Sequence, residues 1–225
     1  MIQPFKKNES VRGELKLRGD KSISHRAVMF AAMANGISLI RNCSDSEDVH
    51  STINCFEKLG CEFEISRNLI KVVGKGFKGF SKPSSELYAG NSGTTARLIS
   101  GVLSAQDFES VITGDDSLSK RPMKRIVEPL RMMGANISAD ESGMMPIRIK
   151  PSSSIKPIEY KLQVASAQVK SALILCAIHL TEESVIIEPV PTRNHTEKLL
   201  GLATIHYMDG TKIFVSKDNY PQPFE

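Results

Sequence analysis

The sequence predicts an α/β domain built from three repeated units, with apolar helices inside and β-sheets outside. Two observations indicate this fold. Three segments with a polar opening run into an apolar helix, beginning at Ser22, Ser92 and Ser166, so the starts are 70 and 74 residues apart. A β-branched run follows each of these helices. Because a unit of this size buries little by itself, we expect the units to pack together with approximate threefold symmetry.

Each unit is expected to follow the order helix, strand, helix, two-stranded ribbon. The β-branched runs that predict the strands lie at 37–40, 110–113 and 184–188. A second helix is expected over 46–59, 120–133 and 194–200, and the first two end at Gly60 and Gly134, which suit a left-handed cap. The ribbons are expected at 61–73, at 135–150, and at 203–207 with 212–215.

Composition narrows the function classes. With 40% hydrophobic and 24% charged residues, the 225-residue chain is typical of a folded globular protein. Its apolar runs are far shorter than the roughly 20 residues of a membrane span, and its amino terminus lacks a secretory pattern, so we expect a cytoplasmic protein. Four cysteines without Cys-x-x-Cys spacing predict no metal site. A net charge of +4 without basic runs, with no Trp and four Tyr, predicts no nucleic-acid partner.

The three helix starts predict a site for a small anionic substrate. A single Ser or Thr at such a position is most simply an N-cap. Symmetry would bring the three starts to one edge, where free backbone N–H groups and helix dipoles favour an anion. The basic residues in or beside these openings are Lys21, Arg26, Arg97, Arg121 and Lys170.

Four ordered motifs carry a family resemblance. They are Gly-Asp-Lys-Ser-Ile-Ser-His-Arg-Ala at 19–27, Gly-Asn-Ser-Gly-Thr-Thr-Ala-Arg-Leu at 90–98, Gly-Asp-Asp-Ser-Leu-Ser-Lys-Arg-Pro-Met at 114–123 and Ser-Ala-Gln-Val-Lys-Ser-Ala at 166–172. In this order they resemble the motifs of 5-enolpyruvylshikimate-3-phosphate synthases. The resemblance implies transfer of the enolpyruvyl group of phosphoenolpyruvate to the 5-hydroxyl of shikimate 3-phosphate, releasing phosphate, on the route to chorismate and aromatic amino acids. It implies no metal or organic cofactor.

The resemblance also implies a role for each matched residue. Lys21 would touch both substrates and serve catalysis, because a compact cation can follow charge that develops during reaction. The residues implied for shikimate 3-phosphate are Lys21, Ser22, Arg26, Ser166 and Gln168. Those implied for phosphoenolpyruvate are Lys21, Asn91, Gly93, Arg97, Arg121 and Gln168. The planar forks of Arg26 and Arg121 suit carboxylate or phosphate, and Gly93 suits close approach of the backbone to a ligand.

Some positions leave alternatives open. Ala167 stands where many family members have a second Ser, so one hydrogen bond to the substrate phosphate is either absent or made by a backbone N–H. We hypothesise that Arg193 compensates, the alternative being an ordinary loop arginine. For Arg97 the alternative to ligand binding is a surface ion pair.

Other positions are interpreted structurally. Lys170 is offset from the matched positions and is read as a solvated helix residue. His25 and His195 are expected to cap or pack rather than to transfer protons.

Length is the largest departure from the family, whose members are roughly twice as long. Their second lobe brings the acidic residues for proton transfer and further cations. We therefore expect three parts here: 1–18, partly belonging to that second lobe; 19–220, the substrate-binding lobe; and 221–225, the interlobe crossing where the chain is truncated. Such a half is expected to be monomeric, to be inactive alone and to need the carboxy-terminal lobe as its partner.

The sequence also leaves two other functions open. The chain could be an anion-binding domain without catalysis. It could also be a relative of UDP-N-acetylglucosamine enolpyruvyl transferase, but the loop at 115–123 lacks the cysteine typical of that enzyme.

Overall fold

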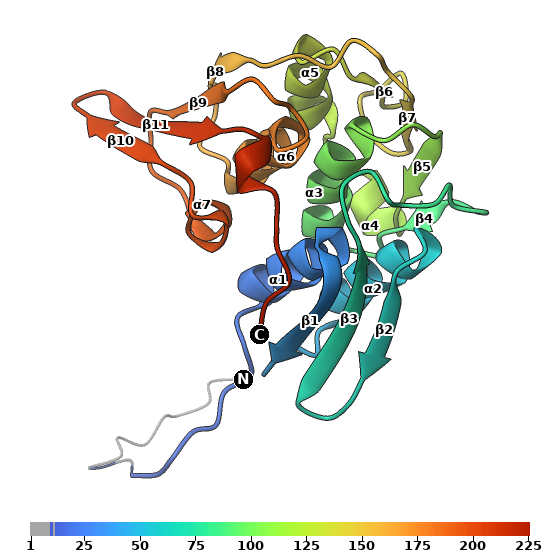
Figure 1. The fold of residues 1–225 in the computed structure, drawn as a ribbon, viewed down its shortest axis with the longest axis vertical. Coiled ribbons are helices and arrows are strands. Elements are labelled where there is room, and N and C mark those ends of the chain that lie inside the picture. Colours follow the sequence, from blue (N-terminus) through green and yellow to red (C-terminus); the bar gives the residue numbers. More distant parts are fainter. Residues whose placement is uncertain (1–9, 11) are drawn as a thin grey trace, which may run out of the picture.

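The computed structural model describes residue 10 and residues 12–225 and shows three sheets arranged around central helices (Figure 1). The first unit contains α1 (Lys21–Met33), β1 (Asn35–Arg41), α2 (Glu47–Lys58), β2 (Glu62–Ile65) and β3 (Leu69–Lys75). The second contains β4 (Leu87–Tyr88), α3 (Gly93–Ser104), β5 (Ser110–Thr113), α4 (Asp116–Ser119), α5 (Lys124–Met132), β6 (Asn136–Ser138) and β7 (Ile147–Lys150). The third contains β8 (Glu159–Lys161), α6 (Ala167–Ala177), β9 (Ser184–Glu188), α7 (His195–Leu200), β10 (Thr204–Tyr207) and β11 (Gly210–Val215). The order helix, strand, helix, ribbon thus occurs three times.

The first helix of each unit lies inside, as the sequence predicts. Ten of the 13 residues of α1, 11 of the 12 of α3 and nine of the 11 of α6 are buried, so these helices expose almost no side to solvent. Helices α3 and α6 pack closely, because Gly101 leaves room for the carbonyl oxygen of Ala172: a Cβ at Gly101 would lie 2.1 Å from it. The ribbons and their strands form the outer layer (Figure 1).

The three sheets share a strand order. It is β1-β3-β2 in the first unit, β4-β5-β7-β6 in the second and β8-β9-β11-β10 in the third. The strand after the first helix pairs antiparallel with the second strand of the ribbon in each unit, for example Ile40 opposite Ile70. Both four-stranded sheets add one strand, β4 or β8, that runs parallel to its neighbour.

The end of the chain takes a similar place beside the first sheet. The backbone N–H of Leu39 in β1 donates to the carbonyl oxygen of Phe224 at 2.8 Å, and the N–H of Phe224 donates to Ser38 Oγ at 3.3 Å. The 221–225 segment therefore packs against the first unit (Figure 1). The predicted boundaries at residues 18 and 220 stay predictions.

Three features differ from the sequence-based expectation. The helix expected over 120–133 begins only at Lys124, as α5, because Pro122 lacks an N–H and disfavours helical geometry at Arg121. The short helix α4 lies before the expected range and was not predicted. The parallel strands β4 and β8 were not predicted, since two or three residues show no alternation to recognise. The glycine caps are as expected, with φ of 95° at Gly60 and 90° at Gly134.

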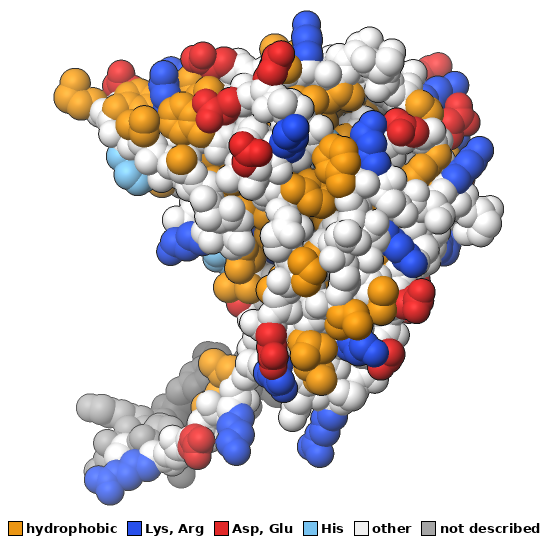
Figure 2. All heavy atoms as spheres, viewed as in Figure 1, with side chains coloured by type: hydrophobic (Ala, Val, Ile, Leu, Met, Phe, Trp, Pro, Cys, Tyr) orange, Lys and Arg blue, Asp and Glu red, His pale blue; other side chains and the backbone are white. Residues whose placement is uncertain are grey.

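The surface is mixed in charge. On the face drawn in Figure 2, lysines and arginines are interspersed with acidic side chains over all three units. In the described part of the chain, no helix combines the length and the apolar character needed to cross a membrane.

Candidate functional site

The three inner helices begin with a side-chain cap, which accounts for their polar openings. Ser92 Oγ accepts from Thr95 N at 3.1 Å and Ser166 Oγ accepts from Val169 N at 3.3 Å. In α1 the cap is Asp20, whose Oδ1 accepts from Ile23 N at 2.8 Å, rather than Ser22. Ser22 is therefore not the cap of α1, and its hydroxyl instead accepts a hydrogen bond from Arg26 Nη1.

Arg26 joins α1 to α6 and α7. Its Nε donates to Thr196 Oγ1 at 2.6 Å and its Nη2 to Ser171 Oγ at 2.8 Å. Its Nη1 donates to both the carbonyl oxygen and the Oγ of Ser22, each at 2.9 Å. These contacts use four of the five N–H donors of the guanidinium. The starts of the first and third inner helices are therefore connected through one side chain.

Arg26 is buried, and most of its donors bond to the protein itself. The residue is 2% exposed, and one N–H donor remains outside the contacts described. Burial lowers its pKa to about 10, the negative charge of Glu197 opposes this shift, and the positive charge of Arg193 adds to it. Arg193 is exposed and close enough for this effect, so the two arginines bring two positive charges to one region.

Gln168 joins α6 to α3. Its Oε1 accepts from Arg97 Nη1 at 2.7 Å, and its Nε2 donates to Thr94 Oγ1 at 3.1 Å. Arg97 is 3% exposed, so it is no surface ion pair. Burial lowers its pKa to about 10, with further lowering by the positive charges of Arg125 and Arg121. Among the described residues Arg97 has no carboxylate in salt-bridge contact, and a bound anion would supply the counter-charge.

Asn91, Gly93 and Arg121 lie together beside Arg97. Arg121 Nη2 donates to Asn91 Oδ1 and, at 3.2 Å, to Ser117 Oγ. A Cβ at Gly93 would lie 2.5 Å from Arg97 Nη1 and 3.6 Å from Arg121 Nη1. A side chain at position 93 would therefore displace the guanidinium of Arg97. The predicted close approach of this backbone to a ligand stays a prediction.

A chain of buried polar groups joins α1, α2 and α3. His25 Nδ1 lies 2.7 Å from Thr52 Oγ1, which lies 2.7 Å from Thr95 Oγ1, and Thr95 Oγ1 donates to Ser92 Oγ at 2.8 Å. His25 is 0% exposed and contacts Thr52, as expected of a packing residue, and burial lowers its pKa to about 4. His195 is the first residue of α7, with Nδ1 3.1 Å from Ser22 Oγ.

The two lysines of the site have opposite surroundings. The Lys21 side chain is 55% exposed and pairs with Asp48 at 2.6 Å. Lys170, interpreted from the sequence as solvated, is 0% exposed and contacts Glu188 at 2.7 Å and Glu197 at 2.6 Å. That interpretation is wrong, because a lysine on a helix packed on all sides has no route to solvent and needs buried carboxylates.

The structure thus brings the predicted residues into two connected groups. One contains Ser22 and Arg26, and the positive charge of Arg193 acts on Arg26. The other contains Asn91, Gly93, Arg97, Arg121 and Gln168. Ser166 caps the start of α6, and Lys21 is the first residue of α1. Sequence reasoning missed Thr196 as a partner of Arg26, since a lone threonine in a short helix carries no recognisable pattern.

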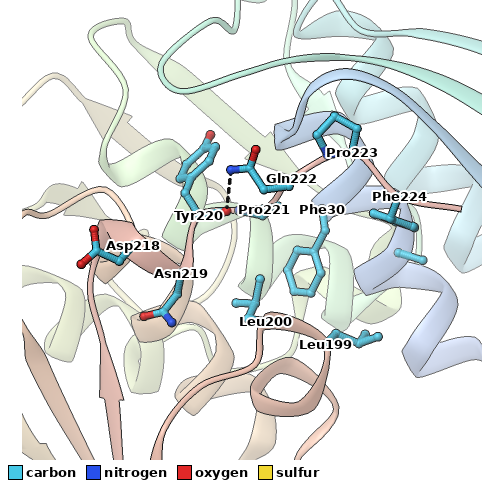
Figure 3. Close-up of a pocket in the computed structure, with 11 residues that line it drawn as sticks. Phe30, Leu199, Leu200, Asp218, Asn219, Tyr220, Pro221, Gln222, Pro223 and Phe224 are labelled. Atoms are coloured by element: carbon cyan, nitrogen blue, oxygen red, sulfur yellow. Dashed lines mark hydrogen bonds between the residues drawn. The ribbon is translucent and has the colours of Figure 1, made fainter.

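An apolar hollow of about 520 Å³ lies elsewhere, between α1, α7 and the end of the chain. It is lined by Phe30, Leu199, Leu200 and residues 218–224 (Figure 3). None of the predicted site residues lines it.

The family model of EPSP synthase (3-phosphoshikimate 1-carboxyvinyltransferase) matches residues 5–215. The chain belongs to this family. A 3-phosphoshikimate 1-carboxyvinyltransferase of Streptococcus sanguinis is 50% identical over 193 residues, 85% of this chain and 45% of that protein. The enzyme of the same name from Salinibacter ruber is 44% identical over 224 residues, 97% of this chain and 51% of that protein. These relatives do not favour the UDP-N-acetylglucosamine alternative.

Solved structures agree with the family assignment. EPSP synthase from Acinetobacter baumannii superposes with a TM-score of 0.87 at 41% identity, covering 94% of this chain and 48% of that one. The enolpyruvyl transferase NikO from Streptomyces tendae shares the fold, with a TM-score of 0.66 at 13% identity. The chain spans about half the length of the relatives it matches.

Proposed function

We propose that this chain provides the shikimate 3-phosphate-binding half of a 3-phosphoshikimate 1-carboxyvinyltransferase. The complete enzyme would transfer the enolpyruvyl group of phosphoenolpyruvate to the 5-hydroxyl of shikimate 3-phosphate, giving 5-enolpyruvylshikimate 3-phosphate and phosphate. It would act in chorismate and aromatic amino acid biosynthesis as a cytoplasmic monomer and a glyphosate target. The second half would supply the acidic residues for proton transfer and further cations for phosphoenolpyruvate.

The observation that supports this proposal most strongly is the joining of the α1, α3 and α6 starts by Arg26 and Gln168. The positive charges of Arg121 and Arg125 act on Arg97, which is buried and lacks a carboxylate partner among the described residues. An anionic ligand there would gain charge-assisted hydrogen bonds in a poorly solvated place.

The roles proposed for the residues follow from their places. Lys21, exposed at the start of α1, would contact both substrates and respond to charge in the transition state. Arg26 would offer its one remaining N–H and its charge to shikimate 3-phosphate, with Ser22, Ser166, Gln168 and Arg193. Asn91, Gly93, Arg97, Arg121 and Gln168 would form this half's share of the phosphoenolpyruvate site.

Calorimetric titration of the 225-residue chain tests the proposal. We expect shikimate 3-phosphate to bind detectably and phosphoenolpyruvate poorly, because most contacts proposed for the former lie in this chain and those for the latter are shared with the second half. Equal affinity for both ligands, or binding of neither, would contradict the proposal.

A turnover assay separates binding from catalysis. We expect the 225-residue chain alone to show no transferase activity, since each general acid–base group typically contributes a factor of about 100 to 10,000. Addition of the carboxy-terminal half of a close relative should restore turnover. If it restores none while shikimate 3-phosphate still binds, a purely anion-binding domain is the better account.

A further inference from the structure

A buried ion cluster lies next to the candidate site, in the third unit. Lys170 Nζ lies 2.7 Å from Glu188 Oε1 and 2.6 Å from Glu197 Oε1. The side chains of the three residues are 0%, 6% and 5% exposed respectively. We call these residues the Lys170 cluster. Its members come from α6, the end of β9 and α7, so it connects three elements of the third unit.

The Lys170 cluster also holds the loop that carries Arg193. Glu188 Oε1 accepts from the backbone N of Thr192 at 3.1 Å and from the Thr192 hydroxyl. Arg193 is the next residue. One carboxylate oxygen therefore contacts both the buried lysine and the loop between β9 and α7.

The third member of the cluster, Glu197, belongs to α7 and contacts α6 through Lys170. Glu197 follows Thr196, whose Oγ1 accepts from Arg26 Nε at 2.6 Å and lies 2.7 Å from Ser171 Oγ. Lys170 and Ser171 are likewise neighbours in α6. The pair Lys170–Glu197 and the pair Ser171–Thr196 thus fix α7 against α6 at two successive positions, and the second of them contacts Arg26.

Stability alone does not explain this arrangement. Burying a lysine and two glutamates is costly, and replacing such groups by apolar residues of similar volume is often neutral or stabilising. The cluster instead fixes the relative positions of α6, β9 and α7, because short charge-assisted hydrogen bonds define where each partner lies.

We propose that the Lys170 cluster is a positioning device for the substrate phosphate, with Lys170 as a positioning residue that sets Arg193 and α7 relative to Arg26 and the start of α6. This inference rests on the proposed function. The cluster itself would not contact the substrate. It would affect binding of the phosphate of shikimate 3-phosphate, whereas other residues would contact the ring.

The preference for shikimate 3-phosphate over shikimate measures this positioning, because the two ligands differ only in the phosphate. We would titrate both ligands, followed by NMR, into the 225-residue chain and its Lys170→Met variant. We expect the variant to lose affinity for shikimate 3-phosphate by on the order of 10- to 100-fold, as misplacement of binding groups typically does, while shikimate binding changes far less. Lys198→Met is the matched control: Lys198 is exposed on α7 beside Glu197, so the same charge is lost without touching the cluster.

The outcomes separate the two proposals. A wild-type chain that does not prefer shikimate 3-phosphate would overturn the proposed function itself. A wild-type preference that persists in Lys170→Met, or a parallel loss for both ligands, would overturn the positioning role only. Should Lys170→Met fail to fold, Thr192→Val decides, because it removes one hydrogen bond from a partly exposed loop residue. It should weaken the same preference, and an unchanged preference in that variant would overturn the inference.

Discussion

At the scale of single residues, the cationic side chains of the site differ in how exposed they are to solvent. Lys21 is more than half exposed, with one carboxylate partner at the surface. Arg26 and Arg97 are buried and bonded mainly to neutral oxygens. A substitution at Lys21 therefore probes ligand binding, whereas one at Arg26 also probes folding.

Lys21→Met should weaken binding of shikimate 3-phosphate by about 1.5 to 3 kcal/mol, the range for hydrogen bonds to charged groups. Its melting temperature should stay close to that of the wild type, since an exposed ion pair contributes about 0 to 1 kcal/mol. Lys71→Met is a matched control, because Lys71 also pairs with a surface carboxylate, Glu64 at 2.7 Å. Calorimetry and thermal melting of both variants decide; equal effects on binding would remove Lys21 from the site.

Arg26→Lys should lower the free energy of unfolding by about 3 to 5 kcal/mol, as breaking a buried charged network does. Lysine keeps the charge but cannot satisfy Thr196, Ser171 and Ser22 together, because it lacks the planar fork. Urea denaturation measures the change. Arg148→Lys, at an exposed position of β7, should change little. Wild-type stability in Arg26→Lys would show that the network is not structural.

At the scale of elements, the contact between α3 and α6 sets how close the helix starts lie. Gly101 has no Cβ, and the backbone of Ala172 occupies the space where one would be. This contact therefore requires a glycine, despite its poor helix propensity, which costs about 1 kcal/mol relative to alanine.

Gly101→Ala should destabilise the chain by about 1 to 3 kcal/mol, the typical cost of overpacking, even though alanine favours helix formation. The gap between Arg97 and Gln168 should widen, so binding should weaken too. Gly13→Ala serves as control, since nothing lies within 4 Å of a Cβ there. A Gly101→Ala variant more stable than the wild type in urea denaturation would contradict the proposed close contact.

At the scale of the whole molecule, two buried histidines make stability depend on pH. Burial lowers the pKa of His25 and of His179 from 6.5 to about 4. Between these values the unfolded chain binds more protons than the folded one, so their contribution is complete above pH 6.5 and is lost as pH falls toward 4. Urea denaturation between pH 7 and 4 should show this fall. The double variant His25→Gln/His179→Gln should flatten it, whereas His206→Gln, at an exposed position, should not.

The repeat predicted much of the fold, because apolar helices and β-branched strands recur at a readable spacing. It did not predict β4 and β8, which are too short for a pattern, or that the helix expected from residue 120 begins only at Lys124, after Pro122. The motifs name residues that the structure brings into contact, such as Ser22 with Arg26 and Arg97 with Gln168. They could not predict that Arg26 and Lys170 are buried, because burial of a charge depends on partners from distant segments such as Thr196 and Glu197.

The measurement that tests the central claim most directly is a map of backbone amide chemical shifts as shikimate 3-phosphate is titrated into the chain. We expect the largest changes at the starts of α1 and α6 and between residues 192 and 197, where Ser22, Ser166 and Arg193 lie. Changes concentrated around Phe30, Leu199 and residues 218–224, the apolar hollow of Figure 3, would contradict the account.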